Sequence, residues 1–147
     1  MIERSRIESF VVKKADYYVD RLSSIEVGNG LWLNFNWAAF FASGLWMLYR
    51  KLYLQVGILI LVLITIELSG LGALLDWVSP ILIGSVIGFY GNYWYLQRFN
   101  RFDEMAREQS SDPSTQERYL HSKGGTNAVG VWIGILLIVA SFGAGLN

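Results

Sequence analysis

The chain has 147 residues, 53% of them apolar, and its twelve basic residues balance its twelve acidic ones. It contains no cysteine and one histidine, His121, which excludes disulfides, thiolate nucleophiles and multi-histidine metal sites. We therefore expect no metal site and no cofactor, and the zero net charge gives no indication of nucleic-acid binding. The length allows one domain, residues 1–147.

The N-terminal segment is predicted to be amphipathic. Apolar side chains recur at helical spacing with charges between them, namely Ile7, Phe10, Val11, Tyr18 and Leu22. The pattern predicts one amphipathic helix of about 17 residues that rests on the membrane surface. Gly28-Asn29-Gly30 then predicts a turn that leads into the first apolar stretch.

The first apolar stretch, residues 31–49, contains residues that a plain membrane span seldom holds. Asn34 and Asn36 lie near its start, and Ser43-Gly44 lies at its middle. These residues favour a bent segment that is re-entrant or lies in the membrane interface. The alternative is a plain fourth span, which would place the N-terminus outside.

Three further stretches, 52–68, 78–96 and 128–146, are each close to the roughly 20 residues that a helix needs to cross a bilayer. The predicted fold is an all-α integral membrane protein with three transmembrane helices, the re-entrant or interfacial segment and the amphipathic N-terminal helix. Four spans are the alternative.

The distribution of lysine and arginine predicts the topology. Residues 69–77 and the end of the chain contain neither, so the positive-inside rule places both outside. The N-terminus is then cytoplasmic. The chain divides into a cytoplasmic amphipathic segment, apolar segments, a cytoplasmic loop and a last transmembrane helix, at residues 1–30, 31–97, 98–125 and 126–147.

The cytoplasmic loop is predicted to be largely helical. Residues 98–109 continue the third apolar stretch without a break signal. Asp112 before Pro113 has the pattern of an N-cap followed by proline at the first helical position, and Gly124-Gly125 ends that short helix.

Glycines form two sets on predicted helices. Gly84, Gly88 and Gly91 lie on one face of the third stretch, and Gly130 and Gly134 repeat the spacing on the last one. Small residues at this spacing let helix backbones approach closely, so we expect these two helices to pack together. The pattern leaves open whether they do so within one chain or between chains.

Other residues near the predicted membrane boundaries have simpler interpretations. Glu67 is the only acidic residue within a predicted span; it is either a solvated helix end or an ion or proton site. Several aromatic and basic residues are predicted to anchor the protein in the membrane interface, namely Trp37, Trp46, Tyr49, Arg50, Lys51 and Trp94.

Several short motifs together resemble one family. They are Phe35-Asn36-Trp37-Ala38-Ala39-Phe40-Phe41, Leu45-Trp46, Leu48-Tyr49-Arg50-Lys51, Gly91-Asn92 with Tyr95, and Lys123-Gly124-Gly125-Thr126. Over roughly residues 30–135 the chain is similar to the bacterial membrane proteins of domain of unknown function 2628. It departs from them at Ala42-Ser43-Gly44, where a glycine-proline bend is usual, and at Asn127, where serine is common. The resemblance implies a small bacterial inner-membrane protein and brings no established activity with it.

The residues favour a non-catalytic function. The sequence offers no nucleophile with a histidine partner, no phosphate-binding glycine loop and no clustered carboxylates, so we expect no enzyme activity. We expect an accessory subunit or adaptor that contacts the lipid bilayer and either other membrane proteins or further copies of itself. The alternative is a self-associating channel, a holin-like protein or a small transporter.

Overall fold

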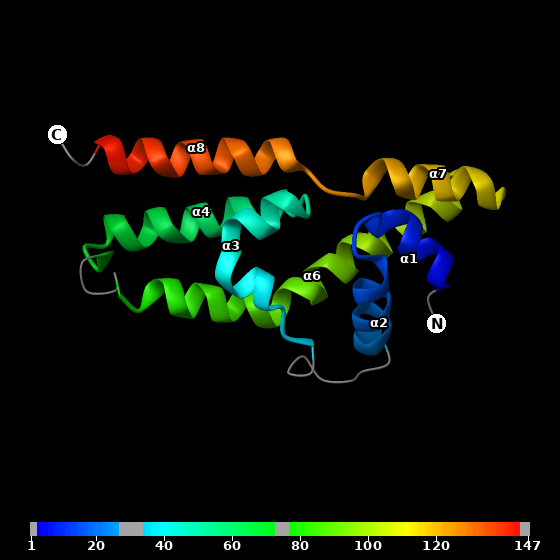
Figure 1. Cartoon of the computed structure of the whole chain (residues 1–147), viewed down its shortest axis with the longest axis horizontal. Coiled ribbons are helices and arrows are strands. Elements are labelled where there is room, and N and C mark those ends of the chain that lie inside the picture. The colour runs from blue at the N-terminus through cyan, green and yellow to red at the C-terminus, as the bar shows by residue number, and fades with distance from the viewer. Residues whose placement is uncertain (1–2, 27–33, 73–76, 145–147) are drawn as a thin grey trace.

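The computed structural model describes residues 3–26, 34–72 and 77–144. All regular structure in these ranges is helical, which confirms the predicted all-α class. The helices are α1 (Arg4–Val11), α2 (Ala15–Glu26), α3 (Trp37–Tyr49), α4 (Tyr53–Leu68), α6 (Ser79–Gln109), α7 (Pro113–Lys123) and α8 (Ala128–Ala144) (Figure 1).

The N-terminal segment is two helices, so the prediction of one amphipathic helix was wrong. Val12 and Lys14 have positive φ values of 62° and 60°, and they separate α1 from α2. A straight helix would turn its apolar stripe toward one neighbour, whereas the break lets α1 contact α7 while α2 contacts α6. Ile7 and Phe10 are fully buried as a result, within the protein core and not on a membrane surface.

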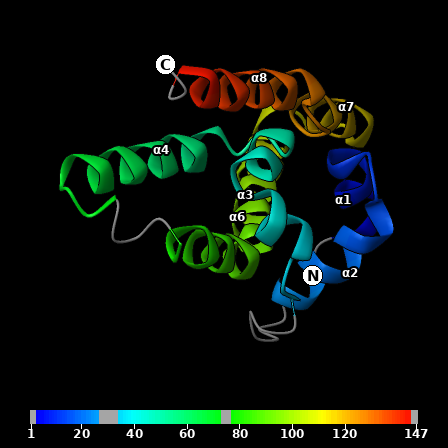
Figure 2. The ribbon, with the colours of Figure 1, turned by 60° about the vertical axis from the view of Figure 1, so that its left-hand side comes forward.

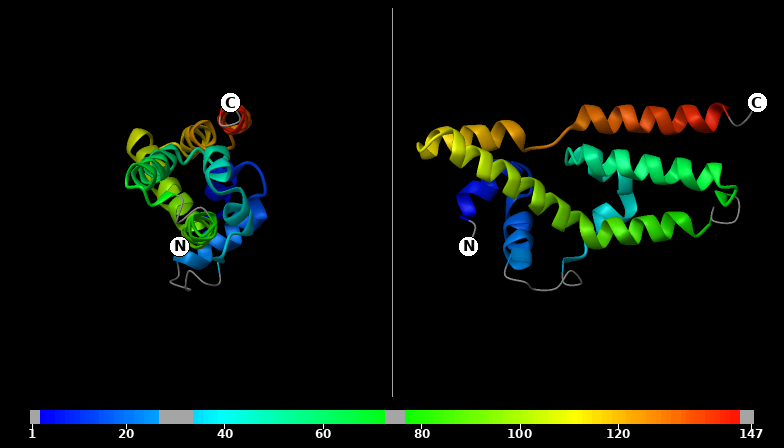
Figure 3. Two further views of the ribbon diagram at one scale, coloured as in Figure 1. Left: turned by 90° about the vertical axis from the view of Figure 1, so that its left-hand side faces the viewer. Right: turned by 180° about the vertical axis from the view of Figure 1, so that it is seen from behind.

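Helix α3 is bent and lies across the other apolar helices. Asn36 caps its start by accepting a hydrogen bond from the backbone N–H of Ala39 at 2.9 Å. Ser43 then interrupts the helix with φ 37° and ψ −111°, at the Ser43-Gly44 pair where a bend is expected. The helix contacts both α6 and α8, and it lies near the start of α4 (Figures 1 and 3).

Three apolar helices, α4, the first half of α6 and α8, run side by side (Figure 3). Among the described helical stretches, only 113–141 is long and apolar enough to cross a membrane, judged by length and composition. That stretch includes the α7–α8 connection, and its apolar part is α8. Helix α4 has only 16 residues, and the apolar part of α6 runs into Asn92 and Tyr93. By this criterion the three predicted spans are not supported.

The buried core lies where α1, α2, α6, α7 and the end of α3 meet. The ring of Phe10 lies 5.6 Å from that of Tyr95 and 5.5 Å from that of Phe99, and Leu120 is buried in the same cluster. We call α1, α2, α7 and the second half of α6 the cap, which lies at one side of the molecule in Figure 2. We call α3, α4, the first half of α6 and α8 the apolar half.

Candidate functional site

The glycines of α6 lie against α3. A Cβ built at Gly84 would be 2.7 Å from the carbonyl oxygen of Phe40, and one at Gly88 would be 2.6 Å from the ring of Phe35. Space at Gly91 is similarly limited, by the ring of Trp46 at 3.1 Å. These missing side chains therefore allow α3 to approach α6 closely.

The glycines of α8 do not pack against those of α6, contrary to the prediction. A Cβ at Gly134 would be 2.9 Å from the side chains of Leu45 and Leu48, so Gly134 also faces α3. At Gly130 a Cβ would meet only the side chain of Asn127, the residue just before α8. The two glycine faces do not meet each other, because α3 lies between α6 and α8.

Two buried amides join α3 to α6 beside these glycines. The Asn36 side chain donates to Asn92 Oδ1 at 2.8 Å, and the Asn92 side chain donates to the carbonyl of Asn34 at 2.9 Å. The backbone N–H of Asn36 donates to the carbonyl of Gly88 at 2.8 Å. Both side chains are almost fully buried, so each hydrogen bond satisfies a group that water cannot reach.

Arg50 lies at the centre of a buried cluster next to this contact. Its guanidinium carbon is 4.2 Å from the centre of the Tyr18 ring and 5.4 Å from that of Tyr95, which are cation–π distances. Its Nη2 donates to the carbonyl of Lys13 at 3.3 Å, while Nε and Nη1 are buried without a hydrogen-bond partner. Burial raises the pKa of the Tyr18 hydroxyl. The ring therefore stays neutral at pH 7 and stabilises Arg50 through its face.

Lys51 and Arg98 lie side by side at the end of α7. The Lys51 Nζ donates to the carbonyl of Gly124 at 2.5 Å, and Arg98 Nη2 donates to the carbonyl of Lys123 at 2.9 Å. Cations at this position satisfy the last carbonyls of a helix and its negative dipole end. Burial lowers the pKa of Lys51, and the charge of Arg98 lowers it further. Burial also lowers the pKa of Arg98.

We call Arg50, Lys51 and Arg98 the basic junction. In the described part of the chain, no carboxylate lies within salt-bridge distance of any of them. Three cations thus meet here, and their partners in the described ranges are backbone carbonyls and aromatic rings, including the ring of Phe102, whose centre is 4.8 Å from the Arg98 guanidinium carbon. Their shared positive charge favours an anionic partner, because cations form their strongest hydrogen bonds with anionic acceptors.

Gly124 and Gly125 hold the basic junction together. The backbone N–H of Gly125 donates to the carbonyl of Phe10 at 2.7 Å, with Gly125 at φ 72°. A Cβ at Gly124 would overlap the carbonyl group of Phe10, so only glycine fits. The backbone N–H of Asn127 donates to the carbonyl of Tyr49 at 2.9 Å. The connection between α7 and α8 is therefore tied to both α1 and α3.

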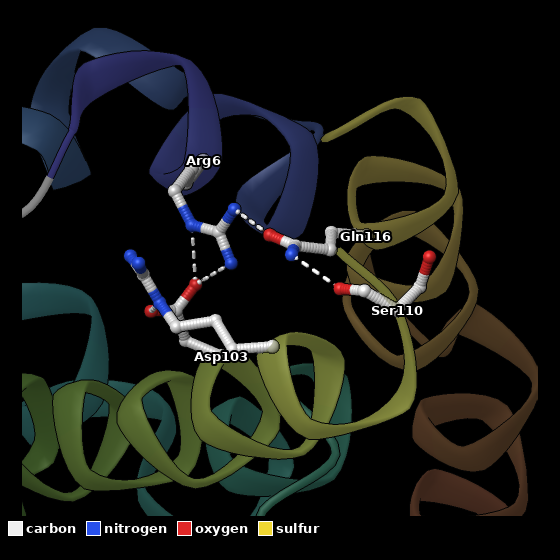
Figure 4. Close-up of polar contacts among 5 residues, drawn as sticks. Arg6, Asp103, Ser110 and Gln116 are labelled. Carbon is white, nitrogen blue, oxygen red and sulfur yellow. Dashed lines mark hydrogen bonds and ion pairs between the residues drawn. The ribbon is translucent and has the colours of Figure 1, made fainter. Parts of the chain in front are cut away.

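A second buried arginine fixes the cap (Figure 4). Arg6 Nε donates to Asp103 Oδ1 at 2.6 Å, and Arg6 Nη2 lies 2.5 Å from the same oxygen. Arg6 Nη1 donates to Gln116 Oε1, and the Gln116 amide donates to the carbonyl of Ser110, each at 2.6 Å. This network ties α1 to α6 and α7, and its charges are paired, unlike those of the basic junction.

The other predicted site residues lie apart from the basic junction. Glu67 is exposed at the end of α4, and no group of three His, Cys, Asp or Glu in the described ranges could hold a metal ion. Of the predicted interface anchors, Trp37 is 65% exposed, and Tyr49, Lys51 and Trp94 are half-buried. Arg50 and Trp46 are instead buried inside the protein, because α6 and α2 cover them.

Sequence reasoning missed Asn92, Tyr18 and Arg98 as members of the site. Asn92 occurs in the motifs on which the family resemblance rests, but nothing in its neighbours identifies Asn36 as its partner. Tyr18 is one of the apolar residues of the predicted amphipathic helix, and Arg98 lies at the start of the predicted cytoplasmic loop, where the sequence indicates no partner for it.

These features define a small all-helical protein with an apolar half, a charged cap and an unpaired basic cluster between them. The family described as Protein of unknown function (DUF2628) matches residues 7–101, and the chain belongs to this family. The match extends from α1 into the second half of α6, and it includes all three residues of the basic junction. No curated protein matches the chain, and no solved structure does.

Proposed function

We propose that this protein is a multi-pass protein of the bacterial inner membrane that acts, without catalysing a reaction, as an accessory subunit or adaptor. The observation that carries the proposal is the division of its surface into two halves. Helix α4 buries none of its residues, and large apolar side chains are exposed along it and along α8. Among them are Leu61 at 64%, Leu68 at 83% and Leu136 at 66%. Water would strongly disfavour such a surface, whereas lipid would solvate it.

The arrangement of helix ends supports the proposed topology. The end of α4, the start of α6 and the end of α8 lie at one end of the molecule, away from the cap (Figures 1 and 3). Ten of the twelve lysines and arginines lie in the cap, and the other two, Arg50 and Lys51, lie beside it between α3 and α4. Three helices spanning the bilayer side by side, with α3 in the interface and the N-terminus cytoplasmic, fit this distribution.

The polar groups of the apolar half favour a binding protein over a pore. The hydroxyls of Thr65, Ser85 and Ser141 each donate to a carbonyl four residues earlier in the same helix, at 2.7 to 2.9 Å. A pore needs polar groups aligned along several spans, and these are satisfied locally. We therefore place the self-associating channel, the holin-like protein and the small transporter second.

The test is purification of the tagged protein from its native membrane in mild detergent, at its natural expression level. We expect it in the membrane fraction and in a complex of defined stoichiometry with other membrane proteins. A ring of identical chains that makes liposomes leak would favour the channel instead. A solitary monomer that leaves liposomes intact would contradict both functions, and recovery from the soluble fraction would contradict the membrane placement.

A further inference from the structure

An apolar groove lies between α4 and α6, with α3 at its base. It has a volume of about 320 Å³ and is lined by Met47 from α3, by Leu59 and Val62 from α4, and by Val86, Ile87 and Trp94 from α6. Pockets for small ligands have volumes of about 300 to 1,000 Å³. The groove is thus large enough for part of an acyl chain. All six of these lining residues have apolar side chains.

The groove leads to the basic junction. Ile87, Trp94 and Arg98 are spaced at i, i+7 and i+11, which places them on one face of α6. On the opposite wall, Gln55 lines the groove in the first turn of α4, and Lys51 lies two residues before that helix begins. Lys51 and Arg98, in turn, donate to the adjacent carbonyls of Gly124 and Lys123. One end of an apolar groove is therefore marked by two neighbouring cations.

These two cations retain capacity for an anion. Arg98 Nε is buried without a hydrogen-bond partner, and the Lys51 ammonium has three donors, of which one is used by Gly124. No carboxylate among the described residues pairs with either side chain. Their mutual repulsion adds to the cost of their partial burial, and an anion between them would relieve both.

We propose that the groove and the basic junction bind one anionic phospholipid, with an acyl chain between α4 and α6 and the phosphate at Lys51 and Arg98. The inference rests on the membrane placement proposed above. Basic pockets between membrane helices on the cytoplasmic side recognise anionic headgroups by the same physical mechanism. Charge complementarity selects this occupant over a zwitterionic lipid, and the apolar lining selects it over free phosphate.

The test compares phosphatidylglycerol with phosphatidylcholine, both with dioleoyl chains, added to the delipidated full chain in detergent. Native mass spectrometry counts the bound lipids, and a thermal melt follows stability. We expect wild type to retain one phosphatidylglycerol and to melt at a higher temperature with it than with phosphatidylcholine. Equal retention and equal stabilisation by the two lipids would overturn the proposal while leaving the membrane placement intact.

Matched variants test the charged part of the site. Arg98→Gln should reduce phosphatidylglycerol retention about tenfold, as expected for one charge-assisted hydrogen bond, and Arg98→Lys should restore most of it. Arg118→Gln removes an equal charge from an exposed position of α7 and should have no effect. An equal loss with Arg118→Gln would show general electrostatic attraction and overturn the site. Because Arg98 also caps α7, retention is compared at equal helix content.

The groove is tested independently of the charges. Val62→Trp would fill the groove and should abolish retention, whereas Leu61→Trp adds the same ring at an exposed neighbour that does not line it. Unchanged retention in Val62→Trp would overturn the acyl-chain placement. If a second copy of the chain occupies the groove, a dimer will form that Val62→Trp breaks and Arg98→Gln does not, and this result also overturns the lipid assignment.

Discussion

At Gly124 the chain has no space for even a methyl group. A Cβ there would overlap the backbone of Phe10, which cannot move without displacing α1 from the core. We predict that Gly124→Ala lowers the free energy of unfolding by about 1 to 3 kcal/mol, the usual cost of overpacking. Thermal or denaturant unfolding in detergent measures this change.

The matched control at the residue scale is Gly57 in α4. A Cβ there meets nothing within 4 Å, so Gly57→Ala should be neutral or slightly stabilising, because alanine favours the helix. Equal stability of Gly124→Ala and wild type would mean that α1 does not lie against the α7–α8 connection.

Individual residues also show where sequence reasoning reaches its limit. An arginine at the end of an apolar stretch normally marks the membrane interface, and Arg50 was interpreted in this way. It is buried because Tyr18 and Tyr95, from segments far apart in the sequence, present their ring faces to it. Such a partner cannot be found from the residues that surround Arg50 in the chain.

At the scale of elements, the contact between α3 and α6 depends on small residues. We predict that Gly84→Ala lowers the free energy of unfolding by about 1 to 3 kcal/mol, because its Cβ would press on the Phe40 carbonyl of α3. Gly44→Ala is the control, since its Cβ would meet only Leu59, at an ordinary distance of 3.5 Å. Similar melting temperatures for the two variants would contradict close packing at Gly84.

The stabilisation that Asp112 contributes at the start of α7 depends on pH. Hydrogen bonds from Ser114 and Thr115 lower the pKa of Asp112 from 3.8 to about 2. A carboxylate with a lowered pKa stabilises the fold above its unfolded pKa, and that stabilisation is lost as the pH falls from about 4 through about 2.

Asp112→Asn provides the comparison, because asparagine still caps a helix but does not titrate. We predict that the difference in melting temperature between wild type and Asp112→Asn is constant above pH 5 and shrinks between pH 4 and 2. A difference that stays constant down to pH 2 would show that the Asp112 carboxylate has the same pKa in the folded and unfolded states.

The ends of the helices were largely predictable from the sequence, whereas the neighbours against which each helix packs were not. Asp112-Pro113 and Gly124 bound α7 as expected, and α6 continues to Gln109 as its periodicity indicates. The pairing of the α6 and α8 glycines was wrong because a small residue permits close approach without specifying the helix that approaches. The break at Val12 was missed because neither Val12 nor Lys14 is typical of a positive φ.

For the whole molecule, the topology is directly testable in this cysteine-free chain. Cysteines at the exposed positions Asp20, Ser69 and Ser111 would report on the N-terminus, the α4–α6 connection and the loop before α7. We predict that an impermeant thiol reagent labels Ser69→Cys in intact cells, and the other two only after permeabilisation. Labelling of Asp20→Cys in intact cells would show that α3 crosses the membrane.

The length of α6 has a mechanical consequence. This one helix of 31 residues belongs to both the apolar half and the cap, and at 1.5 Å per residue it is about 46 Å long. Membrane helices adjust to bilayer thickness by tilting. In a bilayer α6 would therefore act as a lever, and a tilt of about 10° would displace its far end by roughly 8 Å. Because Arg6 fastens α1 to α6 and α7, the cap would move with α6. In the proposed topology, the thickness of the membrane would then set how the cap is positioned relative to the membrane surface.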